Sequence, residues 1–177
     1  LESGRDNLFH AQFDLSAAVR TAATPYAIEA TRKNLSFAIE IAPEAHGLFM
    51  GDGMRVQQVV DLLVSNAIKY TDRGGVTVRL EEEERVGIRS MFKLSVIDTG
   101  LGFDETTAGA LFERFTQGAN ARGGLGLGLA IADAIARAMG GAINASADSG
   151  LGSTFTVRMP LERPMEEATA HQQRQIV

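Results

Sequence analysis

A glycine-rich run that leads straight into a helical pattern is the feature that most restricts how this chain can fold. Residues 123–128 read Gly-Gly-Leu-Gly-Leu-Gly, and an apolar-periodic segment follows at residues 130–139. Glycine permits positive backbone angles and close approach, and the first N–H groups of a helix have no partner within it. The run therefore predicts a helix start that holds an anion such as phosphate, although similar runs also occur in ordinary loops.

A second glycine turn comes earlier, after the apolar-alternating residues 91–97. It reads Asp98-Thr-Gly100-Leu-Gly102, so Asp98 lies where a predicted strand opens into a loop. A carboxylate in this place can accept a hydrogen bond from an amino group such as that of adenine. An Asp before a Gly-x-Gly turn is also a common strand end, so this motif gains its weight from its order with the others.

The helical pattern at residues 54–70 carries polar residues beside its apolar face. The core-facing stripe consists of Val56, Val59, Val60, Leu63, Val64 and Ala67. At about 100° per residue, Leu62, Asn66, Lys69 and Tyr70 form a second stripe. A solvated Asn and Lys are one interpretation. The alternative is that Asn66 supplies an oxygen to magnesium, Lys69 meets phosphate and Tyr70 lies against a base.

Five motifs in this order resemble those of one known family. They are Asn66-Ala-Ile-Lys69-Tyr70, Asp98-Thr-Gly-Leu-Gly102, Phe112-Glu-Arg-Phe115, Gly124-Leu-Gly-Leu-Gly128 and Gly150-Leu-Gly-Ser-Thr-Phe155. They resemble the N, G1, F, G2 and G3 boxes of the ATP-binding catalytic domain of sensor histidine kinases, which belongs to the GHKL superfamily and has the Bergerat fold. Five boxes at plausible spacing make chance agreement very rare.

The resemblance implies binding of ATP with Mg²⁺ and transfer of the γ-phosphoryl group to a histidine on a separate dimerisation domain. Asn66 would hold the metal and, with Lys69, serve catalysis, while Asp98 would bind the adenine amino group. Two phenylalanines, Phe112 and Phe115, would anchor a lid at residues 116–123. The implied nucleotide-binding residues are Asn66, Lys69, Tyr70, Asp98, Gly100, Gly102, Phe103, Phe112, Phe115, Arg122, Gly124, Leu125, Gly126, Leu127, Gly128 and Thr154.

The implied partners are the dimerisation domain of the same kinase and a downstream response-regulator receiver domain, with a homodimeric full-length protein. The net charge of −5 argues against a nucleic-acid surface. No apolar run approaches the length of a membrane span, so we expect no membrane contact by this domain and a cytoplasmic location. The chain contains no cysteine, which excludes disulfides and thiolate zinc sites.

Two residues depart from the family pattern. Leu62 stands one turn before Asn66, where many family members have a second polar group, and the adjacent Asp61 points about 140° away from Asn66. Leu125 replaces a frequent small hydroxyl residue. A degenerate module that binds nucleotide or a partner protein without kinase activity is therefore the alternative. ATPases of the gyrase and chaperone kinds are a weaker one, since they use a glutamate where this chain has Leu62.

The remaining patterns predict a two-layer α/β sandwich, with three main helices on one face of a mixed, mostly antiparallel sheet. Strands are predicted at residues 35–41, 47–50, 76–80, 91–97, 142–147 and 153–159, and helices at 13–30, 54–70, 105–112 and 127–139. Asp14 caps the first helix and Pro25 kinks or divides it. The glutamates at 81–84 form a solvated strand end and loop. We expect residues 1–12 to be the end of a dimerisation helix and a linker, 13–161 the catalytic domain, and 162–177 a tail or interdomain linker.

Overall fold

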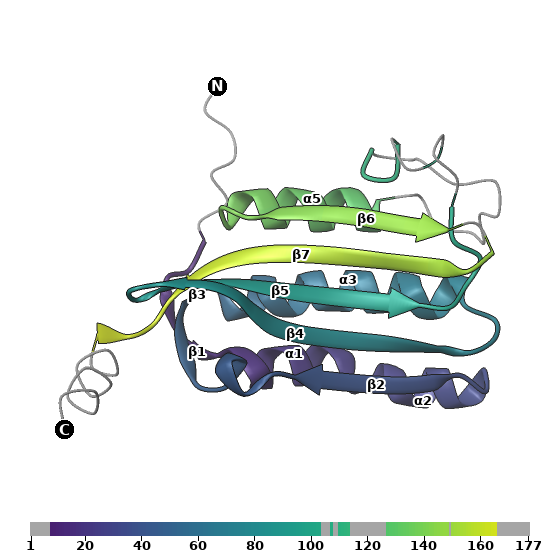
Figure 1. Cartoon of the computed structure of the whole chain (residues 1–177), viewed down its shortest axis with the longest axis horizontal. Coiled ribbons are helices and arrows are strands. Elements are labelled where there is room, and N and C mark those ends of the chain that lie inside the picture. The colour runs from purple at the N-terminus through teal and green to yellow at the C-terminus, as the bar shows by residue number, and fades with distance from the viewer. Residues whose placement is uncertain (1–7, 104–106, 108–109, 114–126, 149, 166–177) are drawn as a thin grey trace.

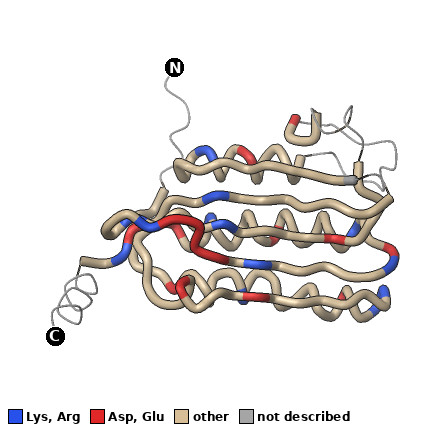
Figure 2. Tube along the Cα trace, in the orientation of Figure 1, with Lys and Arg blue, Asp and Glu red and all other residues tan. Residues whose placement is uncertain are grey.

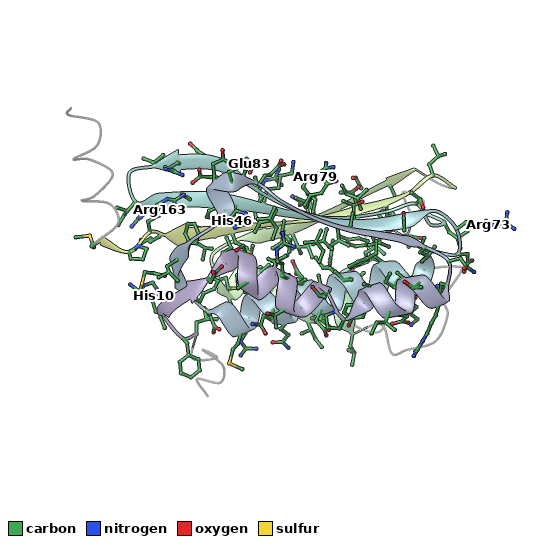
Figure 3. The ribbon with its side chains drawn as sticks, turned by 90° about the horizontal axis from the view of Figure 1, so that it is seen from below. His10, His46, Arg73, Arg79, Glu83 and Arg163 are labelled. Atoms are coloured by element: carbon green, nitrogen blue, oxygen red, sulfur yellow. The ribbon has the colours of Figure 1, made fainter. Side chains whose placement is uncertain are left out.

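The computed structural model describes residues 8–103, 107, 110–113, 127–148 and 150–165. In this part of the chain the helices cover one face of a sheet and leave the other face bare (Figures 1 and 3). The arrangement is the predicted two-layer α/β sandwich.

The elements follow one another as in Figure 1. They are β1 (Ala11–Asp14), α1 (Leu15–Ala23), α2 (Tyr26–Arg32), β2 (Ser36–Ile41), a short 3-10 helix η1 (Pro43–Ala45), β3 (Leu48–Gly51), α3 (Gly53–Tyr70), β4 (Gly75–Val86), β5 (Arg89–Asp98), α5 (Gly128–Ala138), β6 (Ala142–Asp148) and β7 (Gly152–Glu162).

Strand β7 lies in the middle of the sheet although it comes last in the chain. One of its edges pairs antiparallel with β5 along its whole length. Its other edge pairs with β6 and, at Glu162, with Met50 of β3. The order is β1-β3-β7-β5-β4-β2, and β2 with β4 is the one parallel pair among the described strands. The sheet is thus mixed and mostly antiparallel, as predicted.

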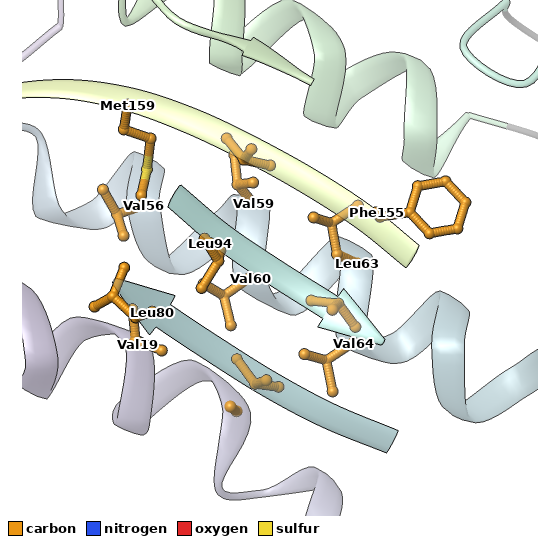
Figure 4. Close-up of a cluster of buried hydrophobic side chains, with 14 of the residues drawn as sticks. Val19, Val56, Val59, Val60, Leu63, Val64, Leu80, Leu94, Phe155 and Met159 are labelled. Carbon is orange, nitrogen blue, oxygen red and sulfur yellow. The ribbon is translucent and has the colours of Figure 1, made fainter. Parts of the chain in front are cut away.

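The core fills the space between the helices and the sheet (Figure 4). The apolar stripe predicted for α3 is buried in full: Val56, Val59, Val60, Leu63, Val64 and Ala67 each have 0% of their surface exposed. Phe49 and Phe92 meet edge to face with ring centroids 4.8 Å apart. Since burying one large apolar side chain contributes roughly 1.5–3 kcal/mol, this core holds α3 firmly against the strands.

Aspartate caps begin two of the helices. Asp14 accepts a hydrogen bond from the N–H of Ala17 at the start of α1, as predicted, and this bond lowers the pKa of the Asp14 carboxyl. Asp52 caps α3 in the same way through the N–H of Arg55. Pro25 separates α1 from α2, because a proline inside a helix removes a hydrogen bond and crowds the preceding turn.

The prediction that residues 81–84 form a strand end and loop is wrong. These glutamates lie inside β4, beside basic residues (Figure 2). Their ion pairs are Glu81 with Lys93 at 3.3 Å, Glu82 with Arg85 at 2.8 Å and with Arg163 at 3.4 Å, and Glu83 with Arg158 at 2.8 Å. Arg79 and Glu83 stand on the uncovered face of the sheet (Figure 3). Cross-strand pairing of opposite charges explains why an acidic run continues as a strand.

Strand β1 is a further difference, because Ala11 and Gln12 were expected in the linker. Ala11 pairs with Gly51 and Asp14 with Leu48, so this segment extends the sheet beyond β3. Four residues are too few to show a clear alternation, and all but Phe13 are exposed. The sheet also runs to Glu162, one residue beyond the predicted domain boundary.

Candidate functional site

The sequence motifs meet at one end of the sheet. The end of β5 with Asp98, the end of α3, the start of α5 and the turn between β6 and β7 lie together on the right of Figure 1. Asp98 is opposite Val76 of β4 and opposite Ser153 of β7. Segments that are far apart in the sequence, from Asn66 to the turn around Leu151, are thereby brought to a common site.

The carboxylate of Asp98 is buried and fixed in orientation, with 5% of the residue exposed. Oδ1 accepts hydrogen bonds from the N–H of Gly100 at 2.9 Å and from the N–H of Ser153 at 3.2 Å. Oδ2 accepts one from the Ser153 hydroxyl. An ionised carboxylate has about four acceptor positions, so one further donor can still be bound by Asp98.

Two glycines allow the backbone to close around this carboxylate. A Cβ at Gly100 would lie 2.6 Å from the carbonyl oxygen of Tyr70, and a Cβ at Gly152 would lie 2.0 Å from the carbonyl oxygen of Asp98. Gly152 also has a φ of +104°. Because a side chain at either position would collide with the backbone, these turns require glycine.

The last turns of α3 present the predicted polar stripe. Asn66, Lys69 and Tyr70 are each half-buried, and the Lys69 ammonium lies 5.4 Å from the centroid of the Tyr70 ring. The Thr71 hydroxyl donates to the carbonyl of Ala67 at 2.8 Å. The polar end of α3 therefore lies directly beside the turn that holds Asp98.

Helix α5 begins at Gly128, the last glycine of the predicted phosphate-binding run. Its N-cap, Leu127, makes no side-chain capping hydrogen bond, so the first N–H groups of α5 receive none from their own cap. A methyl group of Leu62 lies 3.7 Å from the place that a Cβ at Gly128 would take. Leu62, which belongs to α3, thus packs against the start of α5.

Asp61 of α3 contacts α2 and not the predicted nucleotide site. It accepts a hydrogen bond from the hydroxyl of Tyr26 at 2.6 Å and so joins α2 to α3. Burial of the ring, together with this bond and the charge of Asp61, raises the pKa of Tyr26 to about 12. The prediction that Asp61 points away from the Asn66 stripe agrees with this contact.

Two predicted aromatic residues share a partner. The rings of Phe103 and Phe112 lie 6.1 Å and 6.3 Å from the ring of Phe155, measured between centroids. Phe155 belongs to β7 and is 3% exposed. The segment that leaves the Asp98 turn is therefore attached to the same strand that orients Asp98.

Ser153 is the site residue that the sequence reasoning missed. Thr154 was predicted instead, but it pairs with Ile97, whereas Ser153 pairs with Asp98. Side chains alternate along a strand, so Ser153 shares the core face with Phe155 and Thr154 lies on the opposite face. Counting back by two from Phe155 would have selected Ser153.

Some predicted site residues lie outside the described residues. These are Phe115, Arg122, Gly124, Leu125 and Gly126, together with the predicted lid. Of the described helices, none is sufficiently long and apolar to cross a membrane. Within the same residues no group of three or more His, Cys, Asp or Glu side chains could hold a metal ion.

Several known proteins resemble this chain. The family described as Histidine kinase-, DNA gyrase B-, and HSP90-like ATPase matches residues 51–163. Sensor histidine kinase AruS of Pseudomonas aeruginosa is 40% identical over 123 residues, which are 67% of this chain and 12% of AruS. Sensor protein GacS of Pseudomonas syringae pv. syringae is 32% identical over 171 residues, which are 94% of this chain and 19% of GacS.

A solved structure is similar as well. Full-length ShkA in complex with AMPPNP matches with a TM-score of 0.77 and 28% identity, over 91% of this chain and 33% of that chain. The chain therefore spans a third or less of the length of each of these three proteins.

Proposed function

Because the chain belongs to the family of histidine kinase-, DNA gyrase B- and HSP90-like ATPases, we propose that it is the ATP-binding catalytic domain of a sensor histidine kinase. The reaction is transfer of the γ-phosphoryl group of ATP to a histidine on a separate dimerisation domain. The observation that carries the proposal is the buried Asp98 carboxylate, which two glycine turns hold with one acceptor position to spare. That position suits the amino group of adenine.

At the other end of the nucleotide, α3 and α5 supply the groups that phosphate requires. Lys69 offers a cation, and the start of α5 at Gly128 offers backbone N–H groups and the positive end of a helix dipole. Phosphoryl transfer depends mainly on such positioning and on neutralising charge. Gly124 and Gly126, which lie outside the described residues, would be further phosphate-binding positions by the sequence motif alone.

Asn66 fits the role of a magnesium ligand. Mg²⁺ prefers oxygen ligands and is usually bound by one or two side chains together with phosphates and waters. A single amide oxygen on α3, with no acidic cluster among the described residues, matches this pattern. When bound, Mg²⁺ would neutralise charge on the phosphates, while Asn66 and Lys69 keep them aligned.

Leu62 argues against a hydrolase. An ATPase that cleaves ATP with water needs a group that activates the water, and Leu62 offers none at the place one turn before Asn66. Its packing against the start of α5 instead favours an apolar role. The same observation supports a second candidate, a domain that binds nucleotide and signals without phosphoryl transfer.

The partners follow from the reaction. We propose that the dimerisation domain of the same protein supplies the phosphoacceptor and that a response-regulator receiver domain takes the phosphoryl group afterwards. A homodimer would bring each catalytic domain to its dimerisation domain. Since ATP is the substrate, the domain would act in the cytoplasm.

Two measurements test the proposal. Calorimetric titration should show ATP binding that strengthens with Mg²⁺, and radiolabelled ATP should label a supplied dimerisation domain but not this chain. In the sequence, none of His10, His46 and His171 is followed by the acidic residue that the family's phosphoacceptor usually has. ATP binding without label on any tested dimerisation domain would favour the non-catalytic module. Absence of ATP binding would refute both and would leave a module that binds only a partner protein.

A further inference from the structure

The carbonyl groups at the end of α3 are bound by groups from outside the helix backbone. A helix leaves its last four carbonyls without intrahelical partners, and this end carries partial negative charge. In α3 the Ile68 carbonyl accepts a hydrogen bond from the ammonium of Lys33 at 2.6 Å, and the Thr71 hydroxyl binds the carbonyl of Ala67. Lys33 comes from a different element, 35 residues earlier.

A rigid helix end holds Lys33 in this place. After α2, Asn34 takes the left-handed conformation with a φ of +57°. The N–H of Leu35 donates to the carbonyl of Ala30 at 2.8 Å, and the N–H of Asn34 donates to the carbonyl of Thr31 at 3.0 Å. This pair of bonds is the Schellman motif. Leu35 and Ala30 are both buried, so the backbone of Lys33 is fixed from both sides.

We propose that Lys33 is a positioning residue for the phosphate and metal end of the site. Its ammonium holds the end of α3, whose last two turns carry Asn66 and Lys69, and offsets the partial negative charge of this helix end. This inference rests on the proposed ATP-binding function. The hydrogen bonds that orient Asp98 at the adenine end do not involve Lys33, because they come from Gly100 of its own turn and from Ser153 of β7.

The separation of the two ends makes the role measurable. Lys33→Met removes the donor and the charge but keeps most of the stem, and Lys33→Arg restores a cationic donor. Lys93→Met is the matched control, since Lys93 lies on β5, 3.3 Å from Glu81. Each variant is titrated with ATP plus Mg²⁺ and, separately, with adenosine. Exchange of the amide hydrogens of residues 66–70 is measured without nucleotide.

We expect Lys33→Met to weaken binding of ATP with Mg²⁺ about tenfold, the effect of roughly 1.4 kcal/mol, and to change adenosine binding by less than about twofold. Amide exchange at residues 66–70 should accelerate at least severalfold. Lys33→Arg and Lys93→Met should behave like the unmodified chain. If Lys33→Met does not fold, Lys33→Gln, which keeps a neutral donor, is compared with Lys33→Arg on the same measurements and should still bind ATP with Mg²⁺ more weakly.

Three results would overturn the inference. One is equal affinity of the Lys33→Met variant and the unmodified chain for ATP with Mg²⁺. Another is an equal loss for ATP and adenosine, which would indicate a general loss of structure. The third is a Lys33→Arg variant as weak as Lys33→Met. If the unmodified chain binds neither ligand, the proposed function itself fails and the inference falls with it.

Discussion

Ser153 donates two hydrogen bonds to the carboxylate of Asp98, one from its backbone N–H and one from its hydroxyl. The two residues face each other across neighbouring strands, β5 and β7. The carboxylate is therefore oriented by the sheet as well as by the turn that follows it. In the proposed function, the group that binds adenine is held in place before the nucleotide arrives.

Ser153→Ala should weaken ATP binding about fivefold, or about 1 kcal/mol, because Asp98 loses the hydroxyl that helps to orient its carboxylate. The backbone bond from residue 153 is kept. Thr154→Val is the matched control, since Thr154 lies on the opposite face of β7, and it should leave affinity within about twofold. Calorimetric titration of both variants checks this prediction. A larger loss of ATP affinity in Thr154→Val than in Ser153→Ala would indicate that Thr154, and not Ser153, supports nucleotide binding.

Asp98→Asn should reduce ATP affinity by about thirty- to a thousand-fold, corresponding to roughly 2–4 kcal/mol. The amide keeps one oxygen for the N–H groups of Gly100 and Ser153, but its NH₂ group would confront the amino group of adenine. Titration measures the loss, and circular dichroism verifies that the variant is folded. A folded variant with unchanged affinity would remove Asp98 from the site.

Leu62→Asn should have opposite effects on stability and on the response to metal. The half-buried leucine contributes roughly 1 kcal/mol through contact with the core and the start of α5, so the free energy of unfolding should fall by about that amount. The new amide can hydrogen-bond waters around Mg²⁺, so ATP affinity should depend more strongly on Mg²⁺. Leu62→Met is the apolar control. Equal Mg²⁺ dependence in both variants would mean that residue 62 does not face the metal.

Tyr26 should ionise only near pH 12. Below pH 10 its neutral hydroxyl donates to Asp61, so the stability from this bond is fully present there and is lost as the pH rises through 12. Absorbance of the phenolate follows the titration, and Tyr26→Phe leaves Tyr70 as the remaining one of two tyrosines. A Tyr26 contribution that titrates at pH 10 in the folded protein would show that the bond to Asp61 does not hold in solution.

The main elements could be predicted because their patterns are long. The six-residue apolar stripe of α3 and the alternation of residues 91–97 each define a face, and both faces are buried as expected. The glycine turn after Asp98 could also be predicted, and at Gly100 a side chain would collide with the carbonyl of Tyr70.

Contacts between distant segments could not be predicted in the same way. Strand β1 exists because β3 is beside it, and the acidic run of β4 continues as a strand because Lys93 and Arg158 face it across the sheet. Lys33 looks like an ordinary surface lysine until α2 and α3 are packed together. Such pairings form only when the fold brings distant segments together, so a local sequence pattern cannot predict them.

The central place of β7 has a consequence for how the chain acquires its structure. Strand β3 joins the rest of the sheet only through β7 among the described strands, and β6 and β5 also meet there. A chain made from its N-terminus therefore has no complete sheet until residues 152–162 have been synthesised. Contacts over such sequence separations slow folding and leave strand edges open meanwhile. Asp98 can therefore pair with Ser153 only after nearly the whole domain has been synthesised.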